Sequence, residues 1–217
     1  MSDYARQEIL ARIRGAVASA PAIQRPLLPP GPLRQREEIV DQFVEFAAEY
    51  KAKVRRIRGE ELAQAIFDTL KEYGARRVVI PVDLPPFWIS DGLEVTPDVD
   101  LDYSDLDHMD AVITGCAVAI AETGTVVLDA GHAQGRRAIT LIPDHHVCVI
   151  FEEQIVESVP EAVDELRGAV MNGQPLTWIS GPSATSDIEL SRVEGVHGPR
   201  KLAILIVANA DANEAAK

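Results

Sequence analysis

Cysteine is scarce in this 217-residue chain, which contains only Cys116 and Cys148. Both lie in apolar surroundings and neither belongs to a C-x-x-C pair, which fits a reducing, cytoplasmic compartment. An iron–sulfur cluster usually takes four thiolate ligands, and two cysteines cannot supply them. We therefore expect no iron–sulfur cluster in this chain and assign it no cofactor.

Several other signals are missing as well. No apolar run approaches the roughly 18 residues of a membrane span, and the first fourteen residues carry charges in place of a signal peptide's apolar core. Neither a dinucleotide-binding glycine fingerprint nor a P-loop occurs. The histidines lack metal-binding spacing, and the acidic segment 96–108 lacks the glycine and terminal Glu of an EF-hand. No metal site is predicted.

Positive charge is also in short supply. The 21 Lys and Arg residues face 34 Asp and Glu residues, so the net charge is −13 and the pI is near 4.8. Such a chain is repelled by phosphate backbones and anionic lipid. The basic run at 51–58 is typical of a solvated helix end. We expect no nucleic-acid partner.

Residues 1–33 predict a helical arm and a linker. A helix is expected over 3–20, with an apolar stripe at helical spacing. The stripe consists of Ile9, Leu10, Ile13 and Val17. Five prolines between 21 and 32 predict an extended linker. The stripe must pack on its own domain or on another chain, so a homodimer or a partner contact is expected.

Residues 34–208 predict one α/β domain, followed by a polar tail at 209–217. Helices are expected over 34–51, 59–73 and 156–171, and strands over 54–57, 77–81, 111–114, 137–141, 146–151, 176–180 and 202–207. Several strands are apolar on both faces, which is typical of a parallel sheet covered by helices. The prediction is a three-layer, mostly parallel sheet. Residues 117–121 and 125–128 add an antiparallel hairpin.

The turn of that hairpin is the sharpest short motif. A carboxylate at Glu122, between two apolar strands, is expected to be partly desolvated, which raises its pKa and its basicity. This predicts Glu122 as a nucleophile or general base, with Thr123 and Gly124 beside the ligand. The alternative is an ordinary turn acid that faces water.

The segment 178–200 is dense in turn residues and polar side chains between two strand patterns. Its candidate ligand-binding residues are Gly181, Ser183, Thr185, Ser186, Asp187 and Glu194. Backbone N–H groups and hydroxyls after a strand predict a cradle for a small carboxylate or phosphate anion. A capping box over 186–189 would satisfy the same donors. His197, between two glycines, is a candidate catalytic residue for proton transfer.

Two further basic residues, Arg136 and Arg137, follow the glycine-flanked segment 131–135. Guanidinium groups bind carboxylates and phosphates well, so the pair could hold an anion. The competing interpretation is a solvated turn.

Two segments resemble a known family. Residues 181–189 and 193–199 resemble the closing motif of the LUD-domain family, and 114–128 resembles its central motif. The arm, the linker and the length agree, so the resemblance covers essentially the whole chain. It implies a fold of the sugar-phosphate-isomerase and CoA-transferase type. It also implies a role, with two partner proteins that hold the iron–sulfur ligands, in oxidising L-lactate to pyruvate.

The turn at Glu122 is also similar to the Glu-Asn-Gly turn that carries the nucleophile of CoA transferases, with Thr123 in place of Asn. Three functions follow. The first is a non-redox subunit of a lactate utilization complex, which binds a small anion or its iron–sulfur partners. The second is a stand-alone isomerase or CoA/acyl-transferase-like enzyme that uses Glu122. The third is a carboxylate-binding module. The sequence leaves open whether the chain itself catalyses a reaction.

Overall fold

The structure, a computed structural model, describes residues 3–18, 34–185, 193–194 and 198–208. The chain divides into two compact units, Met1–Leu33 and Arg34–Lys217. The first unit contains helix α1 (Asp3–Ala18), which matches the helix predicted over 3–20. The apolar stripe of α1 is exposed, with Ile13 52% and Val17 67% accessible. Glu8 and Arg12 lie one turn apart on α1 and form an ion pair at 2.6 Å, which stabilises the helix.

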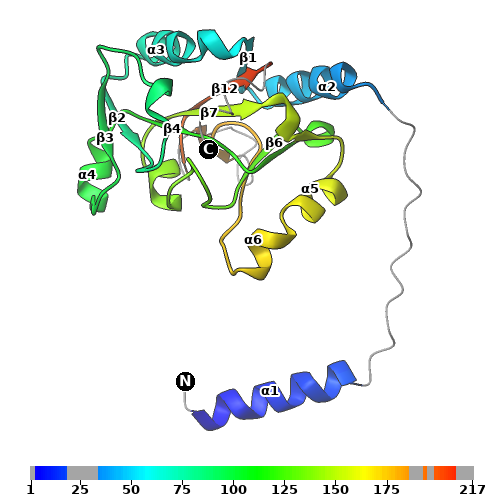
Figure 1. Ribbon diagram of the computed structural model, residues 1–217. Coiled ribbons are helices and arrows are strands. Elements are labelled where there is room, and N and C mark those ends of the chain that lie inside the picture. The colour runs from blue at the N-terminus through cyan, green and yellow to red at the C-terminus, as the bar shows by residue number, and fades with distance from the viewer. Residues whose placement is uncertain (1–2, 19–33, 186–192, 195–197, 209–217) are drawn as a thin grey trace. The chain divides into compact units, whose positions relative to one another are not determined.

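A six-stranded parallel sheet is the frame of the second unit, in the order β1-β12-β7-β4-β2-β3 (Figure 1). Its strands are β1 (Lys53–Ile57), β2 (Arg77–Ile80), β3 (Glu94–Pro97), β4 (Ala111–Thr114), β7 (His145–Phe151) and β12 (Lys201–Val207). The long strands β7 and β12 pair along their whole length in parallel register, from His145 with Lys201 to Phe151 with Val207. Both are almost entirely buried, as the sequence predicts for a sheet that is covered on both faces.

Successive residues of the central strands contribute to two different cores. On one face, Val149 and Leu205 pack with Ile66 of helix α3 (Leu62–Tyr73). On the other face, Ile150 and Ile204 pack with helix α2 (Arg36–Glu49) and with a second, smaller sheet. Because side chains alternate across a strand, continuous apolar runs supply both cores at once. The predicted three-layer arrangement with a mostly parallel sheet is confirmed.

The second sheet has the order β8-β5-β6-β9. Its strands are β5 (Val118–Ile120), β6 (Thr125–Leu128), β8 (Ile155–Val156) and β9 (Thr177–Ile179). Strands β5 and β6 form the predicted antiparallel hairpin, joined by the helical turn η3 (Ala121–Thr123). Helix α5 (Val159–Glu165) covers the outer face, where Ala162 packs with Val118 and Val127. Helix α6 (Arg167–Met171) follows it on the same side of the molecule (Figure 1).

Two predicted elements differ from the structure. Residues 137–141 form the helical turn η4 (Arg137–Thr140) in place of a strand, because a short apolar run does not distinguish the two. Residues 156–171 are divided among β8, α5 and α6. Pro160 is tolerated only in the first turn of a helix, where its missing N–H has no intrahelical partner, so α5 begins next to it at Val159.

Two elements that the sequence did not predict lie in and just before the acidic segment 96–108. Strand β3 pairs with β2, and helix α4 (Tyr103–Asp107) begins with a reciprocal cap between Asp102 and Asp105. The remaining elements are short helical turns and a small hairpin: η1 (Gly59–Glu61), η2 (Pro86–Trp88), η5 (Glu152–Gln154), β10 (Ala184–Thr185) and β11 (Val193–Glu194). Among the described helices, none is both long and apolar enough to cross a membrane.

Helix α2 packs unusually closely on the turn of the hairpin. A Cβ added to Gly124 would lie 2.4 Å from the backbone nitrogen of Ala47, and Gly124 also has a φ of +59°. Both features require glycine at this position. The tight turn between β5 and β6 is therefore set by helix packing as well as by its own backbone.

We expect Gly124→Ala to lower the free energy of unfolding by roughly 2–5 kcal/mol, because it adds a backbone clash to the strain of a positive φ. Gly74→Ala is the matched control, since Gly74 has a φ of +72° with nothing within 4 Å of its added Cβ. The control should lose about 1–2 kcal/mol. Equal losses of stability in urea unfolding would show that the close approach of α2 contributes nothing.

Candidate functional site

The segment 178–200 leaves strand β9 and returns to β12 through the small antiparallel hairpin of β10 and β11. The hairpin pairs Ala184 with Glu194, and the backbone N–H of Ser183 donates to Pro199 O at 2.8 Å. The two ends of the segment are therefore held together. Thr185 and Glu194 are placed by their backbones, whereas Ser186, Asp187 and His197 lie outside the described residues.

A cavity of about 260 Å³ lies against this segment. Gly181 and Ser183 line it together with Ser180, which places two of the predicted ligand-binding residues at one site. The opposite walls come from η4 and from the amino ends of β7 and β12, where His146 and Leu202 lie. The lining combines hydroxyl groups with the exposed ring of Trp178.

Arg137 is the cationic side chain of this cavity. It lines the wall from η4, and its Nη1 donates to Thr177 Oγ1 at 2.9 Å. Within the described part of the chain, no carboxylate forms an ion pair with it. An exposed guanidinium next to hydroxyl groups, with no described carboxylate paired to it, has the chemistry of an anion site.

The neighbouring Arg136 has a different role. Its guanidinium binds Asp98 through two hydrogen bonds of 2.7 and 2.8 Å and also donates to the Leu101 carbonyl at 2.6 Å. The hydrogen bond to Asp98 raises the pKa of Arg136 above its ordinary value. Arg136 therefore anchors the loop after β3, and of the two arginines only Arg137 lines the cavity. The sequence identified the two arginines as a possible anion site but did not indicate that only one of them lines a cavity.

His146 lines the same cavity but supplies no charge. It is 1% exposed, and burial lowers its pKa to about 4. Its Nε2 lies 2.8 Å from Thr114 Oγ1, so the neutral ring has a hydrogen-bond partner. Arg137 is thus the source of positive charge among the described residues that line this cavity.

Glu122 does not point to this cavity. Its side chain is exposed, so the prediction that this carboxylate is partly desolvated is wrong. Its Oε1 accepts a hydrogen bond from the Val159 backbone N–H at 2.7 Å. This contact satisfies a donor at the start of α5. Thr123 is connected to the cavity instead, because its Oγ1 donates to Thr125 Oγ1 at 2.8 Å, which lies 2.7 Å from Ser180 Oγ.

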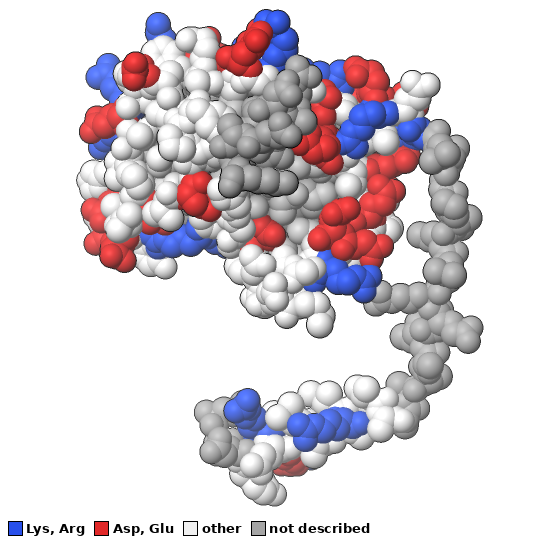
Figure 2. All heavy atoms as spheres, in the orientation of Figure 1, with Lys and Arg blue, Asp and Glu red and all other residues white. Residues whose placement is uncertain are grey.

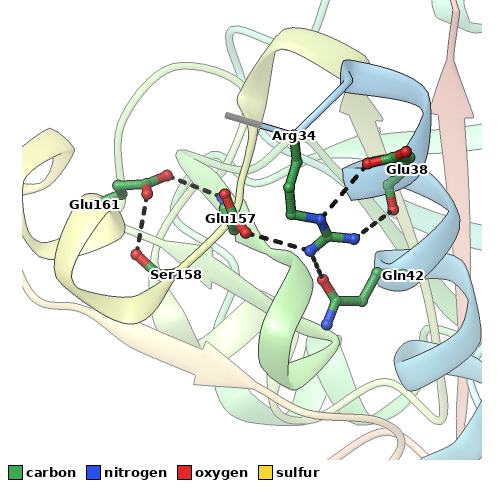
Figure 3. A network of polar contacts seen from close by, with 6 residues as sticks. All are labelled: Arg34, Glu38, Gln42, Glu157, Ser158 and Glu161. Carbon is green, nitrogen blue, oxygen red and sulfur yellow. Dashed lines mark hydrogen bonds and ion pairs between the residues drawn. The ribbon is translucent and has the colours of Figure 1, made fainter. Parts of the chain in front are cut away.

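An acidic cluster surrounds the start of α5. Figure 3 shows the guanidinium of Arg34 held between Glu38, Gln42 and Glu157, with Nη1 3.3 Å from Glu157 Oε1. Glu161 accepts in turn from Glu157 N at 3.0 Å. Figure 2 shows acidic side chains gathered on the face where α2 and α5 lie in Figure 1. Glu122 joins this network through its backbone N–H, which donates to Glu157 O at 3.1 Å.

No metal centre is formed by the side chains that the structure describes, where no group of three or more His, Cys, Asp or Glu residues could hold an ion. The two cysteines are buried. Burial raises the pKa of the Cys116 thiol well above its ordinary value, so the thiol stays protonated at neutral pH. A protonated, buried thiol is a poor metal ligand.

Comparison with known proteins gives consistent matches. A family model described as the LUD domain matches residues 40–207. Lactate utilization protein C of Deinococcus radiodurans is 48% identical over 205 residues, which cover 94% of this chain and 95% of the relative. The protein of that name from Bacillus subtilis is 29% identical over 192 residues, which cover 78% and 80%. A crystal structure of a DUF162 family protein from D. radiodurans is similar with a TM-score of 0.72 and 44% identity, covering 81% of this chain and all of the other.

The contact at Glu122 predicts a structural effect. Glu122→Ala removes the acceptor for the Val159 N–H and should lower the free energy of unfolding by about 1 kcal/mol, whereas Glu122→Gln keeps an acceptor oxygen and should lose less. Denaturant unfolding measures both changes. Full stability in Glu122→Ala, together with loss of function in Glu122→Gln, would instead assign this carboxylate to chemistry.

Burial of His146 predicts a pH dependence of stability. Its pKa is about 4 in the folded chain and about 6.5 when unfolded, so between these values the unfolded state binds the extra proton. This contribution to stability is complete above pH 6.5 and is lost as the pH falls toward 4, by about 3 kcal/mol in total. Replacing His146 with Gln should flatten the slope in urea unfolding at several pH values. The exposed His108→Gln control should keep the wild-type slope.

Proposed function

The chain belongs to the LUD domain family, as its two sequence motifs indicate, and from that membership we propose that it takes part in L-lactate utilization. In this proposal it is a subunit that binds a small carboxylate, such as lactate or pyruvate, and has no redox centre of its own. A relative named lactate utilization protein C, which aligns with 94% of this chain, supports the pathway.

The observation that carries the ligand assignment is Arg137 in the cavity at Gly181 and Ser183. A guanidinium offers two parallel N–H donors to one carboxylate, which gives both affinity and orientation. The hydroxyls of Ser180 and Thr177 lie in the same cavity and can accept from the hydroxyl of lactate or donate to the keto oxygen of pyruvate. Ser183, Gly198 and Pro199 line the same cavity.

The redox step is assigned to iron–sulfur proteins that act as partners. The chemistry of the cysteines supports this division, because one buried, protonated thiol and its buried neighbour cannot ligate a cluster. Such a complex would work in the reducing cytoplasm. The exposed stripe of α1 offers a contact for a partner or for a second copy of the chain.

A stand-alone isomerase or CoA-transferase-like enzyme is a weaker proposal. It requires the Glu122 carboxylate as a nucleophile or base, and that carboxylate is bound to the Val159 N–H beside α5. The proposed CoA-transferase type of fold would apply to either function, so it does not decide between them.

Arg137→Gln should weaken binding of L-lactate or pyruvate by about 10–150-fold, because a hydrogen-bonded charge is worth about 1.5–3 kcal/mol. In the wild type, a ligand at 100 times its Kd adds about 2.7 kcal/mol of stability, which thermal unfolding can detect. The variant at the same ligand concentration should gain only about 0.3–1.4 kcal/mol, and so show a clearly smaller shift. Arg167→Gln is the control, since Arg167 is an exposed arginine on α6 that pairs with Asp164.

The same variants test the role in cells. A strain that lacks the chain should grow on L-lactate when it carries Arg167→Gln and should fail to grow when it carries Arg137→Gln. The tagged wild-type chain, purified from lactate-grown cells, should bring iron–sulfur proteins with it. If the ligand stabilises Arg137→Gln and the wild type equally, this cavity is not the carboxylate site. If the deletion strain grows normally on L-lactate, the proposed role in L-lactate utilization is wrong.

A further inference from the structure

A second cavity, of about 210 Å³, lies at the carboxyl end of the main sheet. Pro85 and Trp88 follow β2, Gly115 follows β4, and Phe151 ends β7. The chain leaves β2 toward β3 in one direction and leaves β4 toward β7 in the other. Such a reversal opens a crevice between the two strand ends, and open α/β sheets bind ligands there.

A histidine and a carboxylate form a fixed pair at this cavity. His132 lines the cavity, and its Nδ1 lies 3.0 Å from Asp83 Oδ2. The same oxygen accepts from the Ala133 backbone N–H at 3.0 Å. A carboxylate that accepts at Nδ1 places the proton of the neutral ring there, so Nε2 is left as an acceptor. Asp83 therefore orients His132 and defines what its other nitrogen can bind.

The loop that carries His132 is held in an unfavourable conformation. Ala130 and Ala133 both have a φ of +57°, which is rare for residues other than glycine. Asp129 Oδ1 accepts from Gly131 N at 2.9 Å, and Ala133 O accepts from Gly115 N at 2.7 Å. The surrounding hydrogen bonds thus maintain a strained backbone that presents the histidine. Strain of this kind is concentrated at functional sites.

The lining defines the ligand by charge and polarity. One side of the cavity is apolar, with the rings of Trp88 and Phe151 6.2 Å apart. The other side carries Asp129 and His132, and no Lys or Arg is among the described residues that line it. With Asp83 at the histidine, two carboxylates lie near the cavity. A carboxylate or phosphate ligand would be repelled here, in contrast to the cavity at Arg137.

Trp88 adds an unsatisfied donor. Its ring is 3% exposed, and its indole N–H is buried without a hydrogen-bond partner among the described residues. Buried polar groups are rarely left unpaired, so an ordered water is expected to accept from this N–H. A hydroxyl group can donate to His132 Nε2 and also accept from an N–H donor. A neutral ring can pack on the apolar wall.

We propose that this cavity is a second ligand site, which takes a neutral compound of the nucleoside class, with its ring on the Trp88 and Phe151 wall and a hydroxyl donating to His132 Nε2. This site is separate from the carboxylate site of the proposed function. The two sites differ in charge and lie at opposite ends of the strands, so each can be tested without the other.

Calorimetric titration of the full chain with adenosine, guanosine, cytidine and uridine tests the proposal. At least one nucleoside should bind, and His132→Gln should weaken it by about 3- to 10-fold, the loss expected for one neutral hydrogen bond. His108→Gln, which removes another exposed histidine, should bind as the wild type does. The 5′-monophosphate of the same nucleoside should bind this site more weakly, and Arg137→Gln should leave nucleoside binding unchanged.

Histidine labelled with ¹⁵N locates the binding event. The His132 signal, identified by its absence in His132→Gln, should shift when the nucleoside is added. Asp83→Asn provides a second variant that keeps the ring but removes its carboxylate, and it should also weaken binding. The proposal is overturned if none of the four nucleosides binds at millimolar concentration, if His132→Gln and Asp83→Asn bind as well as the wild type, or if the monophosphate binds this site as tightly.

Discussion

Helix α2 packs against two glycine-containing turns so closely that neither turn has room for a side chain. A Cβ at Gly124 would lie 2.4 Å from Ala47 N, and one at Gly181 would lie 2.4 Å from Tyr50 O, just after the helix. Both glycines have a positive φ. The helix therefore joins two segments that are far apart in the sequence, and the Thr125–Ser180 hydrogen bond of 2.7 Å joins them again.

This constraint explains why the two sequence motifs lie together although they do not share one cavity. Gly181 belongs to the wall of the Arg137 cavity, whereas the Glu122 carboxylate turns toward α5. The hairpin turn contributes to the site by supporting it, through Thr125 and through its fit under α2. Residues of a motif can thus be required by packing, and only contacts separate that role from a chemical one.

Charge is divided between the ends of the main sheet. The Arg137 cavity lies where β7 and β12 begin, and the His132 cavity lies where β4 and β7 end. Because the strands are parallel, the two cavities lie at opposite ends of the strands. In a chain of net charge −13, Arg137 places a positive charge at the first end, and no described carboxylate forms an ion pair with it. The carboxylates of Asp83 and Asp129 place negative charge at the second end.

The parallel sheet, the β5–β6 hairpin and the family could be predicted from the sequence, because runs that are apolar on both faces and short turn motifs are local signals. It was ambiguous at η4 and at 156–171, where short apolar runs fit a helix or a strand equally well. Which side chains share a cavity depends on the tertiary structure. Arg137 contacts Thr177 and shares a cavity with Ser180, and Asp83 contacts His132, and each pair is separated by 40 or more residues. Strand order and loop packing create those neighbours, and no local pattern encodes them.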